Sequence, residues 1–174
     1  MDYEKIKHEI EEKIPAKYEA AGIYCIKANN KIVYIGKSQN MKRRVAEHIF
    51  AIDIWTAREK IKYETLRKLN RLGYNIDFDI LETVEESDIN KLADQEARWI
   101  YTYMPILNFQ LPIVGGSFKK NPRFLGSIEE SVKEIMKEPS VIDTMNSYIR
   151  LGLDFDAWFD NKSIKNYIGV RGNG

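Results

Sequence analysis

Residues 21–48 read AGIYCIKANNKIVYIGKSQNMKRRVAEH, and this stretch decides the fold. Two short apolar, β-branched runs, 22–27 and 32–36, flank Asn29-Asn30, a pattern typical of a β-hairpin. After Gly36 the apolar period lengthens from two residues to about 3.6, which predicts a helix from about residue 40 to residue 50. A hairpin that runs directly into a helix is therefore the first structural expectation.

The length of the hairpin loop decides whether Tyr24 and Tyr34 share a face of the sheet. A two-residue turn at Asn29-Asn30 places Tyr24 opposite Ile35 and sends the two rings to opposite faces. A three-residue loop places Tyr24 directly opposite Tyr34 and puts Asn30 in the left-handed region, which asparagine tolerates. Because cooperation between the tyrosines requires one face, we predict the three-residue loop.

The composition is that of an ordinary soluble protein. The chain has 174 residues, of which 44% are hydrophobic and 30% are charged, which fits one domain with or without a small appendage. The single cysteine, Cys25, excludes an internal disulfide, and no apolar run is long enough to span a membrane. Without a recognisable signal peptide, these features favour a cytoplasmic location and no membrane partner.

Charge is strongly segregated along the chain although the formal net charge is only +1. Residues 31–74 contain eleven Lys and Arg against four Asp and Glu, whereas residues 75–100 contain two against eight. This pattern is expected of a site that binds a polyanion with one part and a cation with another. The alternative is two solvated helices of opposite sign.

Further elements are expected on both sides of the hairpin. They are an amphipathic helix over 2–14, a basic helix over 56–72, an edge strand over 76–81, a helix over 88–104, and two or three short helices within 127–169. Pro15, Gly73 and Pro105 end the first three helices. We find no chemistry in the C-terminal helices.

The helix over 88–104 carries a local conflict, because Glu96 lies at the centre of its apolar stripe. A carboxylate on a buried face is costly unless it is paired or binds a cation. Either an arginine neutralises Glu96, or Glu96 holds a metal or acts as an acid or base. Arg44 is the candidate partner, and it lies one helical turn from His48. Together they form either a phosphate clamp or a salt-bridged arginine beside a structural histidine.

Two segments after this helix offer weaker signals. Asn108 is a polar residue among apolar neighbours, where it either satisfies loop backbone groups or orients a ligand. Residues 115–123 form a flexible basic loop with one aromatic residue, and Lys119 and Lys120 within it are candidate phosphate contacts.

Over roughly residues 21–109 the sequence resembles the GIY-YIG nuclease family. Gly22-Ile23-Tyr24 and Tyr34-Ile35-Gly36 look like its two name-giving motifs. The other matched positions look like its helix arginine, the following histidine, its metal-binding glutamate and its closing asparagine, and they are Arg44, His48, Glu96 and Asn108. Six matches in the right order make a specific signal. Residues 1–20 and 112–174 match nothing known.

The resemblance implies an α+β fold, with a small three-stranded antiparallel β-sheet flanked by helices and extra C-terminal helices. It divides the chain into an N-terminal helix over 1–20, a catalytic domain over 21–111, and a basic loop with a helical extension over 112–174. It also implies a DNA endonuclease that uses one divalent cation, Mg²⁺ or alternatively Mn²⁺, held by Glu96.

The same resemblance assigns expected roles to individual residues. Arg44 would contact the nonbridging phosphate oxygens, and a tyrosine would take the proton from the attacking water. We favour Tyr24 in this role, with Tyr34 supporting it and His48 relaying the proton, although the resemblance does not settle which tyrosine acts. A phenol at its ordinary pKa of about 10 needs a strong positive field for this role. Expected substrate contacts are Lys37, Arg43, Asn108, Lys119 and Lys120.

Other functions stay open on the sequence alone. One alternative is a DNA-binding module of the same fold that does not cleave, and another is an interaction domain in which Glu96 and Arg44 form a buried ion pair. Among nucleases, the sequence favours a free-standing restriction, homing or phage-type enzyme over a repair subunit. A homodimer is one way in which such an enzyme would cut both strands.

Overall fold

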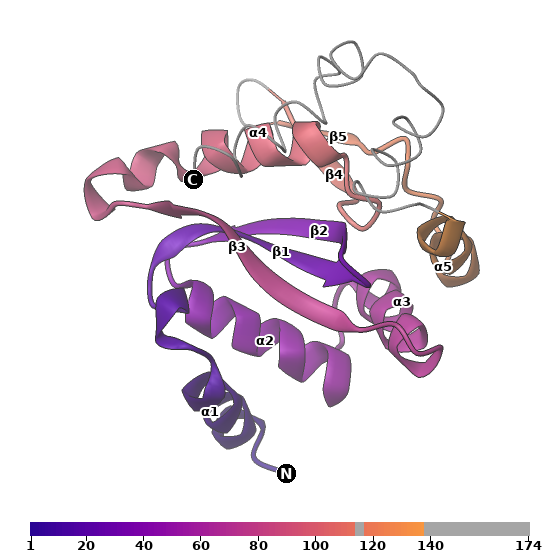
Figure 1. The fold of residues 1–174 in the computed structure, drawn as a ribbon, viewed down its shortest axis with the longest axis horizontal. Helices are drawn as coiled ribbons and strands as arrows, with labels where there is room; N and C mark the ends of the chain where they lie inside the picture. The colour runs from indigo at the N-terminus through magenta and orange to yellow at the C-terminus, as the bar shows by residue number, and fades with distance from the viewer. Residues whose placement is uncertain (114–116, 138–174) are drawn as a thin grey trace, which may run out of the picture.

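A computed structural model describes residues 1–113 and 117–137, and these residues form a mixed α+β fold (Figure 1). The strands are β1 (Ala21–Ala28), β2 (Lys31–Ser38), β3 (Ile76–Val84), β4 (Gln110–Pro112) and β5 (Phe118–Lys120). The α-helices are α1 (Tyr3–Lys13), α2 (Met41–Asp53), α3 (Lys60–Arg71), α4 (Leu92–Tyr103) and α5 (Ile128–Lys137). Two 3₁₀ helices, η1 (Ala16–Tyr18) and η2 (Glu86–Lys91), precede β1 and α4.

The central sheet has three antiparallel strands in the order β2-β1-β3. Helices α2 and α3 lie on one face of this sheet and α4 lies on the other, as Figure 1 shows. The expected α+β class, with a small antiparallel sheet flanked by helices, is confirmed. Of the helices expected within 127–169, α5 is observed, and the remainder of that segment lies outside the described residues.

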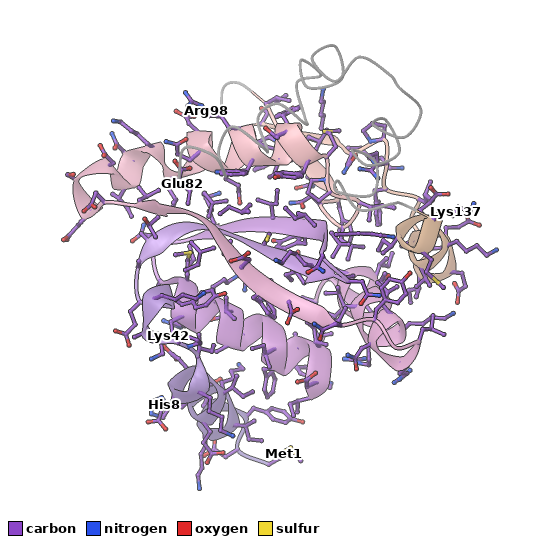
Figure 2. All side chains as sticks on the ribbon, viewed as in Figure 1. Met1, His8, Lys42, Glu82, Arg98 and Lys137 are labelled. Carbon is purple, nitrogen blue, oxygen red and sulfur yellow. The ribbon has the colours of Figure 1, made fainter. Side chains whose placement is uncertain are left out.

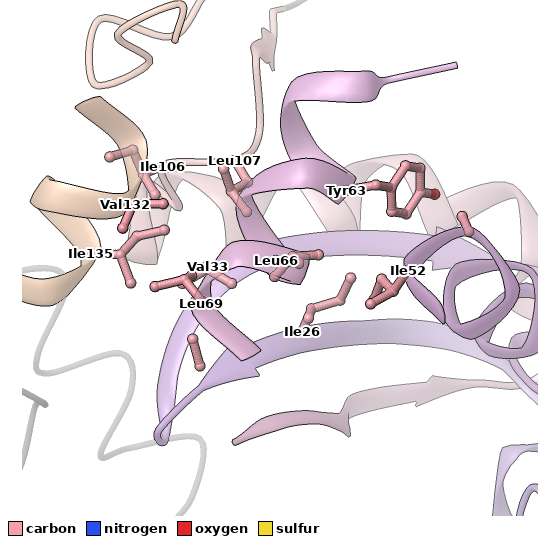
Figure 3. Packing of buried hydrophobic residues seen from close by; sticks show 12 residues of the cluster. Ile26, Val33, Ile52, Tyr63, Leu66, Leu69, Ile106, Leu107, Val132 and Ile135 are labelled. Carbon is pink, nitrogen blue, oxygen red and sulfur yellow. The ribbon is translucent and has the colours of Figure 1, made fainter. Parts of the chain in front are cut away.

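Alternation along β1 supplies both halves of the core. On the α2 and α3 face, Ile26 packs with Ile52, Leu66 and Leu69, and α5 adds Val132 and Ile135 (Figure 3). On the α4 face, Ile23, Cys25 and Ile35 pack against Leu92, Trp99 and Ile100. Side chains fill the space on both faces of the sheet (Figure 2). No helix in the described part of the chain has the length and apolar character that a membrane span requires.

The predicted register of the hairpin is wrong, although its consequence holds. The turn has two residues, because Ala28 pairs with Lys31, and both Asn29 (φ 48°) and Asn30 (φ 67°) adopt the left-handed conformation. The register then shifts between Ile26 and Lys27, so that Tyr24 lies opposite Gly36 rather than Tyr34. This β-bulge accommodates one extra residue in β2 and returns Tyr34 to the face of Tyr24. The two rings lie 6.5 Å apart between centroids.

Candidate active site

Three of the predicted site residues, Tyr34, Glu96 and Asn108, line one pocket beside the outer strand β2. A pocket of about 370 Å³ lies there, and its lining includes Tyr34, Glu59, Glu96, Asn108 and Phe118. These residues come from β2, the segment before α3, α4, the segment after α4, and β5. A cavity of about 400 Å³ between α1 and the start of α2 is lined by other residues, including His8, Glu12 and Lys42.

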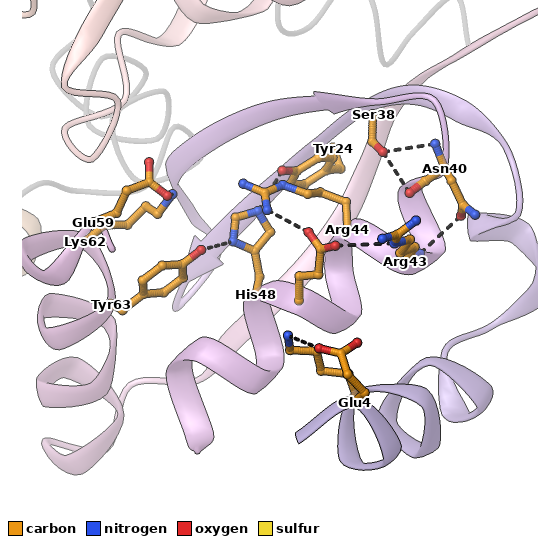
Figure 4. A network of polar contacts seen from close by, with 12 residues as sticks. Glu4, Tyr24, Ser38, Asn40, Arg43, Arg44, His48, Glu59, Lys62 and Tyr63 are labelled. Atoms are coloured by element: carbon orange, nitrogen blue, oxygen red, sulfur yellow. Dashed lines mark hydrogen bonds and ion pairs between the residues drawn. The ribbon is translucent and has the colours of Figure 1, made fainter. Parts of the chain in front are cut away.

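A buried chain of three side chains connects β1, α2 and α3 beneath this pocket (Figure 4). The Tyr24 hydroxyl lies 2.7 Å from His48 Nε2, and the Tyr63 hydroxyl lies 2.8 Å from His48 Nδ1. Tyr24 is 1% exposed and His48 is fully buried. Each ring nitrogen of His48 therefore has a phenol partner, which fixes the orientation of the imidazole.

Burial determines the protonation state of these three hydrogen-bonded side chains. It lowers the pKa of His48 well below 6.5, and the positive charges of Lys62 and Arg44 lower it further. His48 is therefore a neutral imidazole at neutral pH, so one of its nitrogens donates a hydrogen bond and the other accepts one. Burial also raises the pKa of Tyr24 above its ordinary value. The Tyr24, His48 and Tyr63 chain is therefore uncharged at neutral pH, and each of its hydroxyl oxygens and ring nitrogens has a hydrogen-bond partner.

Arg44 lies beside the phenols and keeps a carboxylate partner. Its guanidinium donates to Glu47 at 2.8 Å, and its charge opposes the rise in the pKa values of Tyr24 and Tyr34 that burial causes. The neighbouring Arg43 is 72% exposed and contacts the same Glu47 at 3.4 Å. Adjacent residues on a helix point in different directions, which accounts for the different exposure of the two arginines.

Tyr34 is the phenol that reaches the pocket. Burial raises the pKa of Tyr34 to about 12, the negative charges of Glu59 and Glu96 raise it, and Arg44 lowers it. The ammonium of Lys62 lies 4.1 Å from the centre of the Tyr34 ring. Tyr24 does not line the pocket, so the structure separates the two phenols that the sequence treats as a pair.

Glu96 lies on the pocket wall and its side chain is 15% exposed. Its carboxylate accepts from Lys37 at 3.1 Å, whereas Arg44 is paired with Glu47. Lys37, rather than the expected arginine, therefore balances the charge of Glu96. In the described part of the chain no group of three or more His, Cys, Asp or Glu side chains forms a metal cage. A single carboxylate beside a pocket suits Mg²⁺, which keeps several waters and uses one or two carboxylates with substrate phosphate.

The side chain of Asn108 forms hydrogen bonds with the backbone of β2. Its side-chain oxygen accepts from Ile35 N at 2.9 Å, and its side-chain nitrogen donates to Ile35 O at 2.8 Å. Leu107 N also donates to Val33 O. Of the two interpretations of Asn108, the contacts favour satisfaction of backbone groups over orientation of a ligand.

Two glycines of the motifs are required by close approaches. A Cβ at Gly36 would lie 2.3 Å from the Tyr24 hydroxyl, because the ring crosses that position of β2. A Cβ at Gly22 would lie 2.2 Å from Glu82 O on β3. Both distances are far below van der Waals contact, so these positions accept no side chain without a shift of backbone or ring.

The basic residues after the site lie on a small exposed hairpin. Lys119 and Lys120 are exposed on β5, and Lys119 Nζ lies 5.8 Å from the centre of the Tyr101 ring. Phe118, at the start of β5, is 58% exposed and borders the pocket. This strand thus presents an aromatic ring and two ammonium groups beside the pocket.

The sequence interpretation missed Glu59, Lys62 and Tyr63. Tyr63 completes the partners of His48, and Lys62 is fully buried with an ion pair to Glu59 at 2.8 Å. A signal was available, because Lys62 falls on the same helical stripe as Leu66 and Leu69. A charged residue on an apolar stripe is the same conflict that singled out Glu96.

Comparison with known proteins finds similarity over the part of the chain that contains most of these residues. The GIY-YIG catalytic domain model matches residues 20–108, about half of the chain. The UvrABC system protein C of Fusobacterium nucleatum is 47% identical over 93 residues, which are 53% of this chain and 14% of the length of that protein. No solved structure matches significantly.

Proposed function

This chain belongs to the GIY-YIG family, and on that premise we propose that it is an endonuclease that hydrolyses phosphodiester bonds of DNA with one divalent cation. One observation carries the proposal: Tyr34 lines the pocket and experiences the charges of both Arg44 and Glu96. Phosphodiester hydrolysis requires an activated water and stabilisation of the phosphoryl oxygens. These three side chains supply the groups for both tasks.

Glu96 would hold Mg²⁺, or alternatively Mn²⁺, on the pocket wall. A divalent cation there would supply positive charge that stabilises the phosphate and lowers the pKa of nearby groups. Lys37, now paired with Glu96, would be released toward a phosphate oxygen. Arg44 would bind the nonbridging oxygens with its planar guanidinium.

Tyr34 fits the role beside the attacking water better than Tyr24 does. The Tyr24 hydroxyl is hydrogen-bonded to His48, and Tyr24 is only 1% exposed. Tyr34, by contrast, lines the pocket. A phenol with a pKa of about 12 is protonated in the free protein, so removal of a proton from water requires added positive charge. Tyr24 and His48 would then hold Tyr34 and Arg44 in place.

The central test incubates the protein with supercoiled plasmid and Mg²⁺ and follows nicking and linearisation. Glu96→Ala should lower cleavage by about 10³-fold, the size of effect expected when a main electrostatic contact to the transition state is lost. Asp94→Ala is the matched control, because Asp94 lies on the same helix and is exposed. Nicking that survives Glu96→Ala, or that persists in chelator, would refute the metal role.

Arg44→Ala should lower turnover more than DNA affinity, because one phosphate contact is a small part of a salt-dependent interface. Arg43→Ala, one residue away and exposed, should change mainly affinity. Salt-sensitive binding without a metal-dependent product would instead indicate a non-catalytic DNA-binding module. No binding at low salt would indicate an interaction domain unrelated to nucleic acid.

The biological setting that we propose is a free-standing restriction, homing or phage-type nuclease in the cytoplasm. The likeness to the UvrABC protein is confined to 93 residues, which supports a shared domain rather than a shared assembly. The second candidate is a function like that of a UvrABC system protein C, which the 47% identity over those residues favours. Sequencing of product ends would separate defined sites from scattered incision, and the oligomeric state on DNA would show whether a homodimer cuts both strands.

A further inference from the structure

Lys62 is a fully buried ammonium beside the pocket. Its Nζ lies 2.8 Å from a Glu59 carboxylate oxygen, 4.1 Å from the centre of the Tyr34 ring and 4.8 Å from that of Tyr63. An ammonium has three donors, and burial of this charge is costly unless it is compensated. The carboxylate of Glu59 and the two aromatic faces provide that compensation.

Glu59 stands between Lys62 and the solvent of the pocket. Its side chain is 44% exposed and lines the same pocket as Tyr34 and Glu96. Its backbone is left-handed, with φ 49° and ψ 42°, a conformation that is unfavourable for a glutamate. An acidic side chain is thus held at the pocket wall at a conformational cost.

The same arrangement occurs at three cations near the pocket that could bind a phosphate. Lys37 is paired with Glu96, Arg44 with Glu47, and Lys62 with Glu59. A carboxylate and a phosphodiester present similar oxygen acceptors to such cations. A phosphate that enters the pocket therefore competes with carboxylates that already occupy its binding partners.

We propose that Lys62 is a phosphate-binding residue of this site and that Glu59 occupies its place until the nucleic acid arrives. The proposal rests on the proposed nuclease function and adds a residue to its substrate contacts. Displacement of the exposed Glu59 side chain uncovers Lys62 while the aromatic contacts hold it in place. The carboxylate thereby lowers the affinity of the free protein for weakly fitting anions.

The charge of Lys62 agrees with this role. Burial lowers the pKa of Lys62 to about 8, Glu59 raises it, and Arg44 lowers it. The amine therefore stays protonated at pH 6.5 in the presence of Glu59, and a bound phosphate would replace that stabilising negative charge. His48 is neutral and the nearby phenols are protonated at that pH, so Lys62 and Arg44 are the cations on this side of the pocket that the described residues provide.

The test measures binding of a fluorescent duplex by anisotropy in EDTA at pH 6.5, over a series of NaCl concentrations. Glu59→Gln should tighten binding about five- to tenfold and steepen the salt dependence by about one counterion, as expected for one newly available phosphate contact. Glu64→Gln is the matched control, because Glu64 also lies on α3 and is paired with a cation three residues later, Arg67, away from the pocket.

A second pair of variants decides whether Lys62 receives the phosphate. Lys62→Met keeps the aliphatic stem and should remove the gain that Glu59→Gln provides. An equal gain from Glu64→Gln, or a gain from Glu59→Gln that persists in the Lys62→Met background, would overturn the proposal. If Lys62→Met does not fold, titration of the wild-type protein with a short oligonucleotide replaces it. The ¹⁵Nζ resonance of Lys62 should then shift, and an unchanged resonance overturns the proposal.

These measurements are independent of cleavage because they contain no metal. A protein that cleaves but shows no difference between Glu59→Gln and Glu64→Gln retains the proposed function and loses this inference. A protein that shows the difference but never cleaves loses the nuclease function and retains Lys62 as a phosphate contact.

Discussion

The two faces of the central sheet differ in what they bury. The face under α2 and α3 encloses a hydrogen-bonded chain of Tyr24, His48 and Tyr63. The face under α4 is packed with apolar side chains such as Ile23 and Trp99, and the carboxylate of Glu96 lies at its rim. The first face thus holds three neutral polar side chains in fixed positions beside the cations Lys62 and Arg44. The second face delivers one carboxylate to the same pocket.

This difference shows how buried polar and charged side chains are stabilised near the pocket. Buried phenols and an imidazole cost little when every donor and acceptor is matched, and burial keeps them uncharged. A carboxylate cannot be neutralised so easily, and Glu96 keeps both partial exposure and a lysine partner. We therefore expect substitutions within the Tyr24, His48 and Tyr63 chain to change stability and its pH dependence, and substitutions of Glu96 to change activity.

The largest loss of stability on the first face is expected from Gly36→Ala. The new Cβ would lie 2.3 Å from the Tyr24 hydroxyl, so the ring must leave its place on His48, at a cost of about 3 kcal/mol or more. Urea unfolding measures the loss. Gly73→Ala is the control, because Gly73 has φ +93° but no atom near its Cβ position, and only the backbone cost of about 1 kcal/mol should appear. Equal losses would contradict the steric explanation.

A smaller effect is expected where the α4 side meets the edge of β2. Asn108→Ala removes two hydrogen bonds to Ile35 and should lower the free energy of unfolding by about 2–3 kcal/mol. Exchange of the Ile35 amide hydrogen should accelerate, while DNA affinity of the folded protein should change little. Asn90→Ala, at an exposed position, is the control. Loss of DNA affinity without loss of stability would restore Asn108 as a substrate contact.

The smallest expected effect is a pH dependence of stability that His48 causes. Because the pKa of His48 is depressed in the folded protein, the unfolded chain binds more protons below pH 6.5, and stability should fall as the pH is lowered. Between pH 6.5 and pH 5 the loss should reach at most about 2 kcal/mol, since one proton is worth about 1.4 kcal/mol per pH unit. Denaturant melts of His48→Gln should lack this slope.

His8 provides the comparison for that experiment. His8→Gln is the control substitution, because His8 is exposed on α1 and lies outside the buried chain of Tyr24, His48 and Tyr63. If the wild-type protein and His48→Gln lose stability in parallel, His48 is not the group that titrates.

Sequence patterns predicted the elements of the sheet and the helices better than they predicted contacts. The expected hairpin, the basic helix and the edge strand are all observed, because each depends on local periodicity. The predicted hairpin register was wrong because it did not include the β-bulge after the turn. That bulge depends on the packing of the Tyr24 ring over Gly36, which no local sequence pattern shows.

The site was predictable only in part for a similar reason. Periodicity identified Glu96 as a misplaced charge, but its partner, Lys37, lies 59 residues away in the sequence, and the pairing depends on how α4 crosses β2. Lys62 was missed because a basic helix makes each single lysine look like a surface residue. The apolar stripe indicates that Lys62 is buried, but only tertiary packing shows that Tyr34 and Tyr63 are the residues that enclose it.

The contacts between residues 107–108 and the outer strand have a consequence for self-association. The carbonyl of Val33 and both backbone groups of Ile35 already have partners within the chain, so this stretch of β2 cannot act as a template for a strand from another molecule. Association of two copies by strand addition along this stretch is therefore blocked, and the pocket side of β2 stays protected from intermolecular β-sheet growth.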